Sequence, residues 1–135
     1  MSRIVNREHA ERITRAAAEA IGLTLPPTAR WDIALGGIVF NPLRLLLKDG
    51  HTYADNAFCP LNDPDHAYQI EVALKINVFH RQMTGDSYVI SLRSSEDGQG
   101  GALMQTVNKG DDGKRLRMEA VTMFAALHAL VAAEA

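Results

Sequence analysis

The chain has 135 residues, of which 47% are hydrophobic and 22% charged, a composition typical of a globular protein rather than a disordered one. Its 14 basic and 16 acidic side chains give a formal charge of −2, which argues against a generic nucleic-acid-binding protein. Because Cys59 is the only cysteine and no signal peptide or membrane-length apolar segment is present, we expect one soluble cytoplasmic domain over residues 1–135.

The N-terminal segment predicts a helix over residues 6–21. Asn6 is a suitable N-cap, because its side-chain oxygen can accept from the free amides of the first turn. Gly22 suits the left-handed residue that commonly follows a helix. The apolar stripe repeats at helical spacing and consists of Ile13, Ala16, Ala17, Ala20 and Ile21.

Residues 28–58 read as short strands and turns. Apolar and other residues alternate over 31–35, which favours a half-buried strand. Gly36-Gly37 predicts a turn, and residues 38–40 a second short strand. The apolar run at 43–48 fits a helical turn or a buried strand equally well, because periodicity does not separate the two over six residues.

A second helix is predicted over residues 64–75. Asp63 is a suitable N-cap and Pro64 fits the first helical position, where no amide hydrogen is needed. The apolar face of this helix consists of Ala67, Ile70 and Leu74.

Three strands are expected next, over about 78–83, 88–93 and 102–107, because apolar and polar residues alternate there. They are separated by a turn at 84–87 and a polar, glycine-rich loop at 94–101. Such short connections join antiparallel strands, so the three should form a meander.

The strongest periodic pattern predicts a C-terminal helix over residues 114–133. The residues expected to face the sheet, with Phe124 near its centre, are Leu116, Ala120, Met123, Phe124, Leu127, Leu130 and Val131. Small residues on the other side would admit a second helix, either the 6–21 helix or its copy in a homodimer; that side carries Met118, Ala125, Ala129 and Ala132. The predicted fold is α+β in the order αββαβββα, with three helices packed on an antiparallel sheet of three to five strands.

Two polar clusters are candidate metal or acid–base sites. Asp63, Asp65 and His66 lie at a helix start, where capping and favourable interaction with the helix dipole explain them better than catalysis does. A loop carries Asp49, His51 and Asp55, which could supply three ligands or could simply be solvated. A small metal-dependent hydrolase is therefore the alternative function, although no recognised metal-binding spacing is present and no catalytic residue is assigned.

The remaining reactive residues favour structural roles. Cys59 has no basic neighbour in sequence to activate it and is expected to be a small buried hydrophobe. We expect His80 to be half-buried in a strand, His128 to lie at the polar margin of its helix, and His9 to be exposed. Residues 110–115 superficially resemble a phosphate-binding loop but lack its spacing and its hydroxyl residue, so we expect a turn.

Three segments are candidate partner-binding elements, and one of them is residues 43–57. The 94–101 loop carries Glu96 and Asp97 at the end of the predicted sheet, where loops often bind ligands. The basic cluster of the following turn and helix could bind a protein or, alternatively, nucleic acid; it consists of Lys109, Lys114, Arg115 and Arg117.

Taken together, Trp31, the Phe58–Pro64 turn, the helix after it and the alanine-rich closing helix resemble the phage ABA sandwich domain family. The similarity covers about residues 28–133. The chain departs from the family where Leu61-Asn62-Asp63 replaces the usual Ser-Thr-Asp, and Arg44–Thr52 looks like an insertion. The family supplies no catalytic residue or cofactor to transfer.

The resemblance implies a layered α/β architecture and an origin in a phage or prophage. By analogy, it suggests a small non-enzymatic protein that binds and modulates a host protein, including defence systems such as CRISPR effectors. The expected partner is thus a host protein in the bacterial cytoplasm, and the expected oligomeric state is monomer or homodimer.

Overall fold

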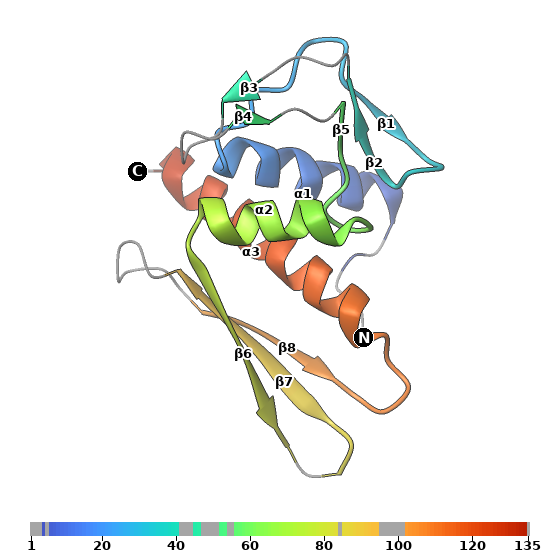
Figure 1. Cartoon of the computed structure of the whole chain (residues 1–135), viewed down its shortest axis with the longest axis vertical. Helices are drawn as coiled ribbons and strands as arrows, with labels where there is room; N and C mark the ends of the chain where they lie inside the picture. The colour runs from blue at the N-terminus through green and yellow to red at the C-terminus, as the bar shows by residue number, and fades with distance from the viewer. Residues whose placement is uncertain are drawn as a thin grey trace.

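The structure is a computed structural model that describes residues 4, 6–40, 45–46, 52–53, 56–83, 85–94 and 102–134. Helices and strands follow in an order that confirms the predicted α+β class with a long closing helix. The strands do not form one sheet: they are divided among small antiparallel sheets, of which two have three strands each. The helices lie between these two sheets (Figure 1).

The first helix, α1 (Arg7–Ala20), begins and ends as predicted. The Asn6 side chain accepts a hydrogen bond from the His9 amide at 2.8 Å. Gly22 has a φ of +80°, and the next amide, that of Leu23, donates to the carbonyl of Ala18 at 2.9 Å. This closing bond satisfies a carbonyl of the last turn, as in a Schellman motif.

The first sheet has the order β1–β2–β5 and consists of β1 (Arg30–Asp32), β2 (Gly37–Val39) and β5 (Ala57–Phe58). The sequence predicted a strand over residues 31–35, and this prediction is wrong beyond Asp32, where β1 ends. The Asp32 carboxylate accepts from the Leu35 amide at 3.0 Å, and its carbonyl accepts from the Gly36 amide at 2.9 Å, so the chain turns there. Ile33 is consequently 73% exposed.

Two further strands, β3 (Leu45–Leu46) and β4 (Thr52–Tyr53), pair antiparallel. The described part of the 43–48 run is therefore a strand rather than a helical turn. The predicted loop residues Asp49, His51 and Asp55 lie outside the described residues.

The second helix, α2 (Pro64–Ala73), confirms its predicted start and its apolar face. The Asp63 side chain accepts from the Asp65 amide at 2.9 Å, and Pro64 occupies the first turn. Ile70 and Leu74 are fully buried in the core.

The predicted meander is confirmed as the sheet β6–β7–β8, formed by β6 (Ile76–Gln82), β7 (Tyr88–Ser94) and β8 (Leu103–Val107). Ile90 and Leu92 of its central strand are fully buried, and the face that carries them packs against the closing helix. The half of the meander nearest the β6–β7 turn extends beyond the helices (Figure 1).

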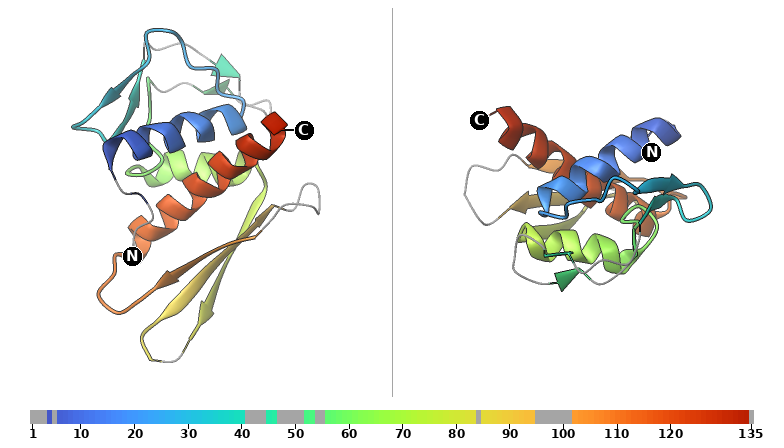
Figure 2. Two further views of the ribbon diagram at one scale, coloured as in Figure 1. Left: turned by 180° about the vertical axis from the view of Figure 1, so that it is seen from behind. Right: turned by 90° about the horizontal axis from the view of Figure 1, so that it is seen from above.

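The closing helix, α3 (Gly113–Glu134), crosses α1, and these two helices make the most extensive contact between elements (Figure 2). Phe124 is 6% exposed and belongs to the core, as predicted. The orientation expected for Leu127 and Leu130 is wrong, because they are 48% and 58% exposed.

Leu127 and Leu130 are exposed because α3 changes its packing partner along its length. Leu116 and Ala120 in its first half are buried on one stripe, and Leu127 continues that stripe past the covered region. In the second half the buried residues include Ala125 and Ala129, on the side predicted to admit a second helix. The predicted partners for that side were α1 and a second copy of α3, and in the structure α1 contacts α3.

Among the helices in the described ranges, none is long and apolar enough to cross a membrane.

Candidate functional site

The Asp63–His66 cluster is built as a structural cap. His66 is 5% exposed, and its Nδ1 accepts a hydrogen bond from the Cys59 amide at 2.8 Å. Its Nε2 lies 3.7 Å from Oδ2 of Asp63, whose other oxygen caps α2. The imidazole thereby fastens the loop before α2 to the first turn of that helix.

Cys59 and Phe58 pack around this histidine. The rings of Phe58 and His66 are stacked, with centroids 6.2 Å apart. Cys59 is buried, and a Cβ at Gly37 would overlap its side chain, so the thiol fills space between the loop and β2. Within the described residues, no group of three or more His, Cys, Asp or Glu side chains could hold a metal ion.

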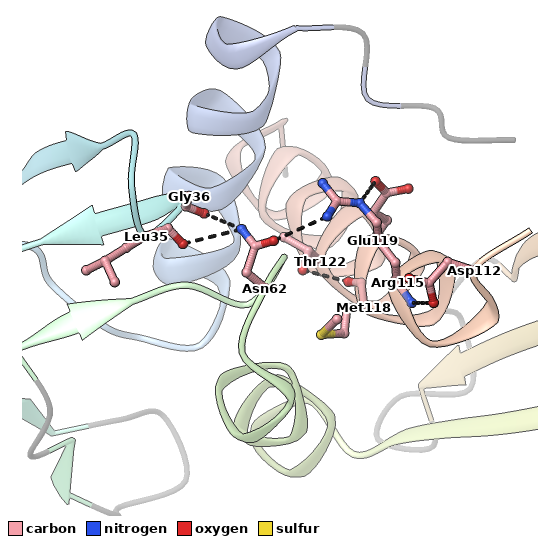
Figure 3. Close-up of polar contacts among 8 residues, drawn as sticks. All are labelled: Leu35, Gly36, Asn62, Asp112, Arg115, Met118, Glu119 and Thr122. Carbon is pink, nitrogen blue, oxygen red and sulfur yellow. Dashed lines mark hydrogen bonds and ion pairs between the residues drawn. The ribbon is translucent and has the colours of Figure 1, made fainter.

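Asn62 joins three segments that are distant in sequence (Figure 3). Its Nδ2 donates to the carbonyl oxygens of Gly36 at 3.0 Å and Leu35 at 3.4 Å, and its Oδ1 accepts from Arg115 at 3.4 Å. Gly36 has a φ of +64°, and a Cβ there would overlap Nδ2 of Asn62. This junction ties the β1–β2 turn and the entry to α2 to the start of α3.

Acidic partners accompany three residues of the predicted basic cluster. Nζ of Lys109 lies 3.7 Å from the Asp86 carboxylate. Arg115 lies 3.6 Å from Glu119, and Arg117 lies 3.0 Å from Glu71 on α2. Lys114, the fourth residue, is exposed. Arg115 and Arg117 thus have structural roles, and partner binding by this cluster stays a prediction. Glu96 and Asp97, the other predicted partner-binding residues, lie outside the described residues.

The segment before α3 is a turn, as expected. The Asp111 amide donates to the Asn108 carbonyl at 3.0 Å, and the Asn108 amide donates to the Asp111 carboxylate at 2.9 Å. This second bond favours the ionised carboxylate and holds the pKa of Asp111 below its ordinary value of 3.8.

The other histidines are scattered. His80 is exposed on β6, not half-buried as predicted, because the helices do not extend over that half of the meander. Its ring lies 5.8 Å from that of Tyr88 across the strand pair. His128 is half-buried on α3, and His9 is half-buried in the first turn of α1 rather than exposed.

A feature that the sequence did not predict is the exposed outer face of the meander, the side turned away from α3. Cross-strand register places Phe79, Ser91 and Met104 in one row across the sheet. Phe79 is 58% exposed and Met104 55% exposed, with the small side chain of Ser91 between them. The described residues of this outer face are Asn77, Phe79, Arg81, Val89, Ser91, Arg93, Met104 and Thr106.

Among the described residues of the outer face, the charged side chains are all basic. Arg81 and Arg93 are exposed there, and none of its described residues is acidic. A sheet face in water normally carries polar side chains, so an exposed phenylalanine and methionine beside two arginines are characteristic of an interface. The sequence signal was the pair of adjacent apolar residues in each edge strand, Val78-Phe79 and Leu103-Met104, which supply apolar groups to both faces.

A scan against protein families found no match, and searches of curated proteins and of solved structures found no similar chain. The resemblance to the phage ABA sandwich domain family therefore stays a prediction from the sequence.

Proposed function

We propose that the chain is a non-enzymatic protein-binding module that holds its partner on the outer face of the meander. The observation that carries this proposal is the row of Phe79 and Met104, each more than half exposed, on a face whose only charges among the described residues are arginines. Phe, Met and Arg are enriched in protein–protein interfaces, whereas Lys, Asp and Glu are depleted there.

The chemistry of the face defines the partner. Its apolar row requires an apolar patch opposite it, and Arg81 and Arg93 require carboxylates at the rim. Single-stranded nucleic acid is a weaker match, because stacking needs several aromatic rings and Phe79 is the only one among the described residues of this face.

The sequence resemblance adds a biological setting to this proposal. It suggests that the protein is encoded by a phage or prophage, and that the partner is a bacterial host protein whose activity it modulates or inhibits. A component of a host defence system, such as a CRISPR effector, is one candidate of this kind.

The test is affinity capture of the tagged protein from a bacterial host extract, followed by mass spectrometry and reconstitution with the purified partner. We expect one stoichiometric protein, and we expect the double variant Met104→Glu, Arg93→Glu to lose it. Tyr68→Glu is the matched control, because Tyr68 is 63% exposed on α2, away from the outer face.

Two results would contradict the proposal. The first is capture that survives the double variant but is lost with Tyr68→Glu. The second is retention of single-stranded nucleic acid, rather than protein, that weakens steeply as salt is raised.

A further inference from the structure

The strand β6 forms one edge of the meander and has the features that pairing with another strand requires. No strand in the described part of the chain pairs with its free edge. It is seven residues long, and half of it extends past the helices (Figure 1). An unpaired regular edge of this kind is a template for strand addition.

The hydrogen-bond pattern identifies the backbone groups that point outward from this edge. The Met83 amide donates to the Ser87 carbonyl at 3.0 Å, so the backbone N–H of residue 83 points toward β7. Because the direction of the backbone N–H and C=O groups alternates along an antiparallel strand, those of residues 77, 79 and 81 also point toward β7. The outward amides and carbonyls are therefore those of Ile76, Val78, His80 and Gln82.

We propose that β6 pairs antiparallel with β6 of a second copy of the chain, about a two-fold axis at Phe79. Phe79 is the midpoint of Ile76–Gln82, so this register alone overlaps the full strand. It places Phe79 opposite its own copy and Arg81 opposite Asn77 of the second copy, without like charges facing each other. A shift of two residues in one direction would set Arg81 against Lys75, and a shift of four would set Arg81 against itself.

The same pairing accounts for the uncovered half of β6. A two-fold axis perpendicular to the sheet puts the helices of both copies on the same side. His80 and Gln82, exposed in one copy, then lie opposite Val78 and Ile76 of the other, where that copy's helices begin to cover the sheet. The product is a continuous six-stranded sheet with Met104 and Phe79 of both copies in one row on its outer face.

This inference does not depend on the proposed function, because it uses the edge of the sheet and leaves the outer face open. The first measurement is light scattering on the purified protein between about 1 and 100 µM. We expect a mass that rises toward twice the 14.8 kDa of the chain. A monomer mass over this whole range would overturn the proposal.

Disulfide trapping then tests the register. Opposite residues in a non-hydrogen-bonded antiparallel pair have Cα atoms about 4.5 Å apart, within the range that a disulfide spans. Phe79→Cys alone should cross-link to itself under mild oxidation, whereas Asn77→Cys and Arg81→Cys should cross-link only when mixed. The buried Cys59 of the unmodified chain provides the uncross-linked control. Efficient trapping by Asn77→Cys alone, or by Met104→Cys instead of Phe79→Cys, would overturn the assignment.

A proline pair provides a third measurement that does not remove Phe79. Val78→Pro deletes an outward amide of β6 and should give a folded monomer, since proline is tolerated at a free sheet edge. Thr106→Pro deletes an outward amide at the opposite edge, on β8, and should stay dimeric. Equal dimerisation of both folded variants would contradict pairing through β6.

Discussion

Nη2 of Arg117 lies 3.0 Å from Oε1 of Glu71, and this ion pair joins α3 to α2. The glutamate side chain is 15% exposed and the arginine side chain 38% exposed, so the pair is only partly screened by water. Its removal leaves a largely buried carboxylate without this guanidinium.

We expect Arg117→Met to lower the free energy of unfolding by about 1–2 kcal/mol, because methionine keeps the apolar stem but not the charged donor. Urea denaturation followed by circular dichroism measures this. The double variant with Glu71→Gln should recover part of the loss, since no buried charge then remains. Additive losses would contradict a direct interaction.

A second prediction concerns the core of α3. Phe124→Ala should destabilise the protein by about 3–5 kcal/mol, because it removes a large side chain that is 6% exposed and leaves a cavity. Leu127→Ala on the same helix is the control, and we expect a loss below about 1 kcal/mol because Leu127 is 48% exposed. Equal losses in thermal or urea unfolding would show that α3 is oriented differently.

The Asn62 junction gives a third prediction. Gly36→Ala should cost about 1–3 kcal/mol, because alanine is strained at a φ of +64° and its Cβ displaces the Asn62 amide. Asn62→Ala removes the same hydrogen bonds from the other side, so the double variant should lose less than the sum of the two single variants. A double-mutant cycle by urea unfolding measures the coupling, and a coupling near zero would be the contrary result.

The loop before α2 gives a fourth prediction. His66→Leu should destabilise the protein by about 1–3 kcal/mol, because the buried Cys59 amide loses its 2.8 Å acceptor. His66→Gln can supply an oxygen acceptor and should recover part of the stability. If both variants unfold at the same urea concentration as the wild type, the imidazole does not hold this loop.

The turn before α3 predicts a pH effect. The Asp111 pKa is lower in the folded chain than in the unfolded one, so this group contributes stability above its unfolded pKa and loses it as pH falls through the folded pKa. Carboxyl ¹³C NMR should show a titration midpoint for Asp111 below its ordinary value of 3.8. Asp111→Asn should lack this contribution at neutral pH, and an ordinary midpoint would exclude the hydrogen bond from Asn108.

The helices and the meander could be predicted from the sequence because their signals are local. Asn6, Gly22 and Asp63 act on backbone groups within a few residues of themselves. The two ends of α1 and the start of α2 therefore did not depend on the rest of the fold. The short connections within the 76–107 region likewise permitted only antiparallel neighbours.

Which residues are buried, and against what, was decided by tertiary structure. Leu127 continues the apolar stripe of α3, yet it is exposed because the covered region ends and α1 packs on the other side of the helix. Alternation along β6 separates Phe79 from Val78 but does not say which face the helices cover. Periodicity fixes the relative positions of side chains within one element, whereas burial depends on contacts between elements far apart in the sequence, and these contacts left Phe79 and Met104 in solvent.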